Sequence, residues 1–170
     1  LRKKIGLSKE ATTLMYVGGY GKSYEKGLEH FFKSIGDQKS KIQILISLHP
    51  KSDGTIERKI SNKYPEINPI IADKKTSSSK LSLISDIVIT QNSTVGVQAL
   101  YQNKEVIYFH TNNHYKDLAI KSGLALQTSD PKKLNETINN FIKNKSVKNI
   151  KLLEIPTNSL SRMKESLGLS

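Results

Sequence analysis

Short apolar runs alternate with segments of helical periodicity along this chain, and this alternation constrains the fold more than any other feature of the sequence. Strands that are separated by helices pair in parallel, because a parallel connection needs a crossover long enough to hold a helix. We therefore expect each run to be one strand of a mostly parallel sheet. The six runs cover residues 13–17, 42–48, 68–72, 86–90, 105–109 and 124–126.

The segments between the runs place apolar side chains at helical spacing. The clearest helix starts at Pro131, which fits a first turn, and Asp130 before it is a suitable cap. This order predicts an α/β, Rossmann-like three-layer domain with a mostly parallel six-stranded sheet and a C-terminal helical tail. The predicted helices cover residues 24–35, 55–62, 81–84, 97–100, 114–122, 131–142 and 159–167.

Two segments carry more detailed expectations. The run at residues 86–90 is the most apolar, which predicts a strand that is buried on both faces near the centre of the sheet. Residues 75–79 are polar and serine-rich, which predicts a loop.

Chain length predicts one domain, since 170 residues with 36% hydrophobic content suffice for one buried core and are too few for two ordinary domains. We expect residues 1–10 to be a linker or an incoming helix and residues 11–170 to form the domain. Because the sequence begins at Leu1 rather than Met, we also expect it to be a fragment of a longer protein. The absence of cysteine excludes disulfides, thiolate metal sites and cysteine nucleophiles.

The formal net charge of +12 favours an anionic partner. Nucleic acid, anionic lipid headgroups and nucleotide diphosphates all fit, as does a basic composition that is spread over solvated faces. Nucleic acid is the least favoured of these, because the sequence has no aromatic stacking motif, recognition-helix signature or concentrated basic stripe. No apolar stretch approaches the ~20 residues that span a bilayer, so we expect a cytoplasmic domain.

Three loops are predicted to lie at the carboxyl ends of the strands, where open parallel sheets bind their ligands. The first, at residues 18–23, reads Gly-Gly-Tyr-Gly-Lys-Ser, and glycine would let its backbone approach an anion closely. It matches neither named phosphate motif. A nucleoside-triphosphatase loop needs glycine where Tyr16 stands, and a dinucleotide fingerprint needs glycine where Tyr24 stands. A tight strand-to-helix turn also explains these glycines.

The second loop begins with His49, since Pro50 cannot continue a strand. A neutral imidazole can donate a hydrogen bond to a phosphate oxygen, and Lys51 adds positive charge nearby. A satisfied polar histidine with no ligand is the alternative interpretation.

The third loop follows the most apolar run and directly precedes a helix. It consists of Gln91, Asn92, Ser93 and Thr94. Helix capping explains these residue types, but capping is compatible with anion binding because the amides of the first turn would still point outward. Gly96 would let a ligand approach the backbone, at a cost of about 1 kcal/mol relative to alanine.

Several segments resemble GT-B glycosyltransferases. Residues 85–107 are similar to a recurring segment of these enzymes, in which a buried strand ends in a Ser/Thr-Gly turn and a helix follows. Residues 46–50 end in His-Pro, as does a strand of glycerophosphate transferases and UDP-N-acetylglucosamine 2-epimerases. Residues 156–163 resemble the final crossing helix of that superfamily. The chain thus resembles the C-terminal, nucleotide-sugar-binding half of a GT-B enzyme.

The resemblance implies roles for residues in each loop. The turns at 18–21 and 93–96 would flank a diphosphate, and His49 would reach a phosphate or a sugar hydroxyl. Position 98 would face the ribose, where a glutamate is usual; Gln98 has one acceptor oxygen and no charge, which should weaken that contact. The residues predicted to bind the donor are Gly18, Gly19, Tyr20, Gly21, His49, Lys51, Gln91, Asn92, Ser93, Thr94, Gly96 and Gln98.

The implied function is donor-substrate (nucleotide-diphospho-sugar) binding in a glycosyltransferase of surface polysaccharide or glycoconjugate synthesis. No catalytic base is recognisable here, and in this superfamily the base and the acceptor site lie largely in an N-terminal domain. We therefore expect the chain to need that missing domain and to be inactive in isolation. No metal or cofactor is expected, since backbone dipoles and basic side chains can stabilise a leaving diphosphate.

Two alternatives stay open. One is a non-catalytic nucleotide- or anion-binding module, which the missing base and Gln98 would both fit. The other is a fragment of a nucleotide-sugar 2-epimerase, although such enzymes carry a histidine in the first loop and this chain has none between Tyr16 and Tyr24. In each case we expect a cytoplasmic location, peripheral to the inner face of the membrane, whose anionic surface would attract the basic chain.

Overall fold

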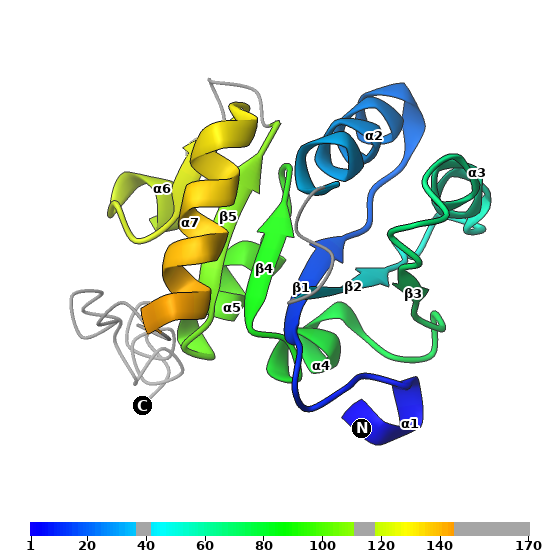
Figure 1. Ribbon diagram of the computed structural model, residues 1–170, viewed down its shortest axis with the longest axis horizontal. Helices are drawn as coiled ribbons and strands as arrows, with labels where there is room; N and C mark the ends of the chain where they lie inside the picture. The colour runs from blue at the N-terminus through cyan, green and yellow to red at the C-terminus, as the bar shows by residue number, and fades with distance from the viewer. Residues whose placement is uncertain (37–41, 111–117, 145–170) are drawn as a thin grey trace, which may run out of the picture.

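The computed structural model describes residues 1–36, 42–110 and 118–144 of the chain. Its centre is a six-stranded sheet in which every pair of neighbours is parallel (Figure 1). The expected α/β, Rossmann-like architecture is therefore confirmed, and the sheet is wholly rather than mostly parallel. The strands are β1 (Thr12–Val17), β2 (Ile42–Ser47), β3 (Ile70–Ile71), β4 (Ile87–Thr90), β5 (Glu105–Phe109) and β6 (Leu126–Thr128).

The order of the strands, β3-β2-β1-β4-β5-β6, creates a switch point in the middle of the sheet. The chain moves outward from β1 through β2 to β3, and then returns to place β4 on the other side of β1. The connections that leave β1 and β4 therefore run to opposite faces of the sheet, and a crevice opens between them at the carboxyl ends of the strands.

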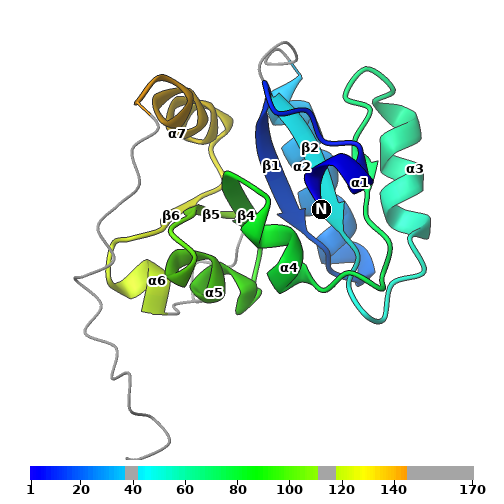
Figure 2. The ribbon, with the colours of Figure 1, turned by 90° about the horizontal axis from the view of Figure 1, so that it is seen from below.

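Helices cover both faces of the sheet, and Figure 2 shows α5 and α6 on the side opposite α7. Apolar side chains of α2, α3 and α7 fill one core, and those of α4, α5 and α6 fill the other. The helices are α1 (Arg2–Ile5), α2 (Gly21–Ile35), α3 (Thr55–Lys63), α4 (Ser78–Leu83), α5 (Val95–Tyr101), α6 (Leu118–Lys121) and α7 (Pro131–Asn144).

Successive side chains of each strand point to opposite faces of the sheet, so one strand contributes apolar residues to both cores. In β1, Leu14 and Tyr16 enter the core under α2, whereas Met15 and Val17 enter the opposite core. All four residues of β4 are buried, and this strand lies between β1 and β5. The expectation of a central, doubly covered strand is confirmed, and the strand begins at Ile87 rather than at Asp86.

Many boundaries differ from the sequence-based expectation by one to three residues, among them those of α4, β6 and β3. α4 begins at Ser78 inside the predicted polar loop, because the Ser77 side chain accepts a hydrogen bond from the Lys80 amide and caps the helix. β6 begins at Leu126, two residues later than predicted, because the Ala125 amide is bonded to the carbonyl oxygen of Ala119 instead of to a neighbouring strand. β3 is only two residues long.

Other expectations concern the ends of the chain. α1 occupies part of the segment 1–10, and the buried Leu7 joins the core under α4 and α5. A role of this segment as a link to another domain stays a prediction. The helix predicted at 159–167 and the first part of that at 114–122 lie outside the described residues.

Tyr16 gives a test of this packing. Its ring is fully buried against Phe31, with 4.8 Å between the ring centroids, and its hydroxyl has no hydrogen-bond partner among the described residues. Burial raises the pKa of Tyr16, so the hydroxyl stays neutral. An unsatisfied buried hydroxyl is unfavourable, so Tyr16→Phe is expected to raise the free energy of unfolding by ~1 kcal/mol.

Urea denaturation would measure this change. Tyr24→Phe is the matched control, because the Tyr24 hydroxyl donates a 2.9 Å hydrogen bond to Glu57. This second substitution should lower stability. Equal losses in both variants would contradict the assignment of Tyr16 as unsatisfied.

Candidate functional site

A cleft lies at the switch point of the sheet, where the loops after β1, β2 and β4 meet. Its volume is about 550 Å³. Eight of the twelve predicted donor-binding residues line it, and they come from all three predicted loops. These eight are Gly18, Gly19, Tyr20, His49, Gln91, Asn92, Ser93 and Thr94.

The loop after β1 is held close to the end of β2 by its first glycine. A Cβ atom at Gly18 would lie 2.6 Å from the amide nitrogen of His49 and would overlap the carbonyl oxygen of Ser47. Gly19 packs in the same way on the ring of Tyr24, because its Cβ would lie 2.7 Å from Cδ2 of that ring. The two glycines therefore let the loop after β1 pack closely on its neighbours. This packing role agrees in part with the alternative interpretation of the sequence, in which the glycines form a tight strand-to-helix turn.

His49 is fixed in one tautomer by its own loop. The amide of Lys51 donates a 3.0 Å hydrogen bond to Nδ1 of His49. In a neutral imidazole this acceptor role leaves the proton on Nε2, so the ring is set to donate a hydrogen bond from Nε2.

Tyr20 and Lys51 flank this imidazole. The rings of Tyr20 and His49 have centroids 4.7 Å apart, and Tyr20 is 59% exposed at the mouth of the cleft. Nζ of Lys51 lies 5.5 Å from the centroid of the Tyr20 ring, within the range of a cation–π contact. Lys51 does not line the cleft itself, so its contribution there is a nearby positive charge.

The corner after β4 is held mainly by its own side chains. Oγ1 of Thr90 accepts a hydrogen bond from the Ser93 amide at 3.1 Å, and Oγ of Ser93 accepts one from the Val95 amide at 3.2 Å. The Gly96 amide is bonded to the carbonyl oxygen of Ser93. These bonds correct the expectation that the amides from 93 to 96 all point outward. Within the described residues, the Thr94 amide is the one of these four that has no hydrogen-bond acceptor.

Gly96 has a different role from the one expected. It is buried, and a Cβ atom there would lie 2.7 Å from Cζ of Tyr108 and overlap the hydroxyl of that ring. The glycine faces β5 and lets α5 pack on the sheet, so packing explains the glycine without a ligand.

Two further predicted residues lie outside the lining of the cleft. Gly21 starts α2 with a φ of 81°, a left-handed conformation that favours glycine. Gln98 is exposed on α5, and its amide is bonded to the carbonyl oxygen of Thr94.

The cleft also contains residues that were not predicted, above all Tyr24 and Ser23 at the start of α2. Burial, followed by the Glu57 carboxylate nearby, raises the pKa of Tyr24, which therefore keeps its proton and donates to Glu57. In the sequence, Tyr24 was considered as a position that lacks glycine and as the start of a helix, and it was not predicted to line the site. The spacing of four residues from Tyr20, one helical turn, could have indicated that both residues lie at the same edge.

The lining of the cleft is polar and contains no carboxylate among the described residues. The described residues also contain no group of three or more His, Asp or Glu side chains that could hold a metal ion. A cleft with glycine backbone, one imidazole, hydroxyls and amides suits an anion better than a cation.

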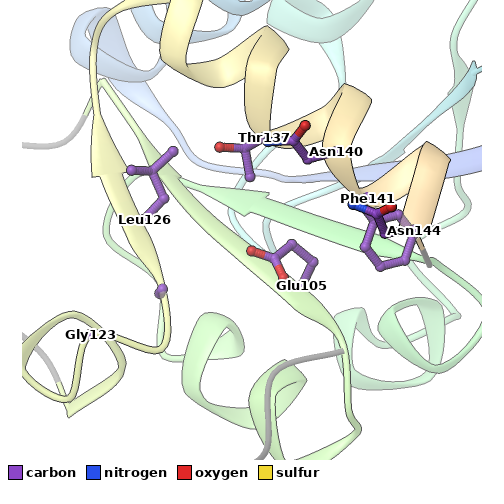
Figure 3. Close-up of a pocket in the computed structure, with 8 residues that line it drawn as sticks. Glu105, Gly123, Leu126, Thr137, Asn140, Phe141 and Asn144 are labelled. Carbon is purple, nitrogen blue, oxygen red and sulfur yellow. The ribbon is translucent and has the colours of Figure 1, made fainter. Parts of the chain in front are cut away.

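A second cavity, of about 400 Å³, lies at the opposite end of the strands (Figure 3). It separates the amino ends of β5 and β6 from the last turns of α7, which contribute Phe141 and Asn144. Glu105, the first residue of β5, points into it and is 6% exposed. None of the predicted donor-binding residues lines this cavity, so it does not compete with the cleft as the predicted site.

The fold and the cleft together define an open, Rossmann-like α/β domain with a polar ligand-type cleft at its switch point. Residues 12–149 match the model of the capsule polysaccharide biosynthesis protein family, and the chain belongs to this family. No curated protein sequence matches the chain.

Solved structures of GT-B enzymes have the same fold. The wall teichoic acid polymerase TagF, in a structure soaked with CDPG, is 21% identical with a TM-score of 0.57, over 84% of this chain and 35% of that one. ADP-heptose lipopolysaccharide heptosyltransferase II of E. coli is 12% identical with a TM-score of 0.65, over 85% and 50%. The CMP-Kdo binding domain of WaaA from Acinetobacter baumannii is 10% identical with a TM-score of 0.60, over 86% and 87%.

These comparisons confirm the resemblance to GT-B glycosyltransferases. The chain spans half or less of the lengths of TagF and of the heptosyltransferase, but most of the WaaA domain. Among the described helices, none combines the length and the apolar character that crossing a bilayer requires.

Proposed function

We propose that this chain binds the nucleotide-diphosphate part of a nucleotide-sugar donor, as the donor-binding half of a glycosyltransferase of surface polysaccharide synthesis. The observation that carries the proposal is the convergence of the three loops at one cleft, with eight predicted residues in its lining. Relatives of the same fold are described with CDPG, CMP-Kdo or UDP, which supports a nucleotide-linked donor here.

In this proposal the phosphates lie between the glycine turn and the Ser93 corner. Nε2 of His49 donates to a phosphate oxygen, and the Thr94 amide donates from the other side. Lys51 adds a positive charge at the mouth of the cleft without direct contact. The close approach at Gly18 holds the His49 loop against the β1 turn.

The chemical consequence is stabilisation of the leaving nucleotide diphosphate. Negative charge develops on the phosphate oxygen as the bond to the sugar breaks, and preoriented donors lower the energy of that state. We propose that no metal is needed for this step. The acceptor and the base that deprotonates it would come from a further domain, in agreement with a cleft in which the described lining residues include no carboxylate.

Isothermal titration calorimetry with UDP, CDP, GDP, ADP and CMP tests the proposal. We expect at least one nucleotide to bind, and His49→Gln to weaken its Kd roughly 10- to 150-fold, the effect of losing a hydrogen bond to a charged group at about 1.5–3 kcal/mol. His30→Gln is the matched control, since His30 stacks on Phe109 and does not line the cleft. Silence of the wild-type chain with every nucleotide would refute the proposal.

A binding module without catalysis is the second candidate, and it is favoured by a cleft whose described lining residues include no carboxylate. The two candidates differ in one measurement on a chain that includes the acceptor domain. Release of free nucleotide diphosphate that depends on an added acceptor would identify a transferase. Tight binding with no such release would identify a binding module.

The site of action that we propose is the cytoplasmic face of the membrane. The net charge of +12 would draw the chain toward anionic lipid headgroups. Co-sedimentation with anionic vesicles that weakens as salt is added would support this location, and equal binding to neutral vesicles would count against it.

A further inference from the structure

Glu57 is a buried carboxylate beside the cleft, in the first turn of α3. It is fully inaccessible to solvent and accepts hydrogen bonds from two hydroxyl groups. The Tyr24 hydroxyl donates to Oε1 at 2.9 Å, and the Ser52 hydroxyl lies 3.3 Å from Oε1 and 3.1 Å from Oε2. Burial of a carboxylate is unfavourable unless such bonds are made, so the three side chains are held in one arrangement.

One partner of Glu57 belongs to the loop that carries His49. The Ser52 hydroxyl also accepts a hydrogen bond from the Gly54 amide, so its single proton is directed to Glu57. The Ser52 amide in turn donates to the carbonyl oxygen of His49 at 2.9 Å. Two hydrogen bonds thus connect the Glu57 carboxylate to the backbone of His49.

The other partner of Glu57 supports the glycine turn. Tyr24 is 3% exposed, lines the cleft, and packs its ring directly against Gly19. Because Glu57 holds the hydroxyl of Tyr24, the orientation of the Tyr24 ring is fixed. The turn at Gly19, which packs on this ring, is fixed with it. The same carboxylate therefore reaches both walls of the cleft at the β1 and β2 side.

We infer that Glu57 is a positioning residue for the donor cleft, which fixes the His49 loop and the Gly19 turn at the spacing that nucleotide binding needs. This inference rests on the proposed function of the cleft. A site whose hydrogen-bond donors are already ordered loses less conformational entropy when its ligand binds. The affinity for the nucleotide therefore depends on Glu57, although Glu57 does not contact the nucleotide.

A general role in joining α2 to α3 does not explain this arrangement. Exposed ion pairs already connect the two helices, with Nζ of Lys59 2.7 Å from Glu25 and Nζ of Lys63 3.3 Å from Glu29. Glu57 lies between the same helices, but it alone of these carboxylates is buried and bonded to residues that border the cleft.

Glu57→Gln is the variant that tests the inference. The amide keeps the shape of the side chain but is uncharged and has an NH2 donor in place of one oxygen. With that NH2 at the position of Oε2, the 3.1 Å bond from Ser52 is lost, and Tyr24 keeps only a neutral acceptor. We expect about a tenfold increase in the Kd of the nucleotide that the wild-type chain binds best. Glu25→Gln is the matched control, since it removes an α2–α3 contact that does not reach the cleft, and its Kd should equal that of the wild type. Equal affinities of Glu57→Gln and Glu25→Gln would overturn the inference.

Nuclear magnetic resonance of the ligand-free chain separates this inference from the proposed function. The ring nitrogen signals of His49 and the amide signal of Gly19 should shift in Glu57→Gln and stay in place in Glu25→Gln. Unchanged signals in a folded Glu57→Gln variant would refute the positioning role even if nucleotide binds. If Glu57→Gln does not unfold cooperatively, Ser52→Ala replaces it, because it breaks the link to His49 and keeps the bond to Tyr24. Wild-type silence in calorimetry would refute the proposed function alone.

Discussion

Replacement of Gly18 by alanine is expected to weaken nucleotide binding by about 100-fold and to lower the free energy of unfolding by roughly 3 kcal/mol. The added Cβ atom would overlap the carbonyl oxygen of Ser47 and lie 2.6 Å from the amide nitrogen of His49. Both atoms belong to the backbone at the end of β2, so no side-chain rotation can relieve the contact. Either the β1 turn or the His49 loop must move, and displacements of about 1 Å at such sites cost on the order of 100-fold in function.

Gly36→Ala is the control for this experiment. Among the described residues, a Cβ atom there would meet the carbonyl oxygen of Lys33 alone, at an ordinary distance of 3.8 Å, and Gly36 has helical backbone angles. Its melting temperature and Kd should match those of the wild type. Calorimetry and thermal denaturation of both variants measure the two effects, and a Gly18→Ala variant with unaltered affinity would contradict the packing assigned to this turn.

Periodicity was sufficient to predict the layers of the fold. Each strand alternates residues between two cores, as Leu14 and Met15 do, and each long helix has an apolar face. This pattern depends only on the burial of side chains, so it is legible in a single sequence. Boundaries were less predictable where a single hydrogen bond decides them, as at the Ser77 cap of α4 and the Ala125 amide before β6.

The location of the candidate site could also be predicted, because parallel strands bring their carboxyl ends to one edge. The role of each residue could not. Whether the Ser93 and Gly96 amides point outward depends on bonds to Thr90 and within the turn itself. The buried contact between Glu57 and Tyr24 joins residues 33 positions apart, and neither residue stands in a recognisable motif. Contacts of this kind need the tertiary structure.

Gly96→Val is the second substitution with a large expected effect. Alanine would already bring Cβ to 2.7 Å from Cζ of Tyr108, and valine adds two carbon atoms at the same place. Tyr108 is fully buried in β5, so α5 must shift away from the sheet. We expect a loss of ~3 kcal/mol in the free energy of unfolding, measured by urea denaturation. Tyr101→Val, on the exposed side of the same helix, should cost less than ~1 kcal/mol.

The two explanations for Gly96 differ in how stability and affinity change together. If the glycine is needed for packing on Tyr108, Gly96→Val lowers the free energy of unfolding. The double variant with Tyr108→Ala then loses at least ~1 kcal/mol less free energy of unfolding than the sum of the two single losses. If it is needed for close approach of a ligand, Gly96→Val loses affinity, keeps its stability and shows no coupling to Tyr108. The buried position of Gly96 against β5 leads us to expect coupling, with any loss of nucleotide affinity following from displacement of the Ser93 corner.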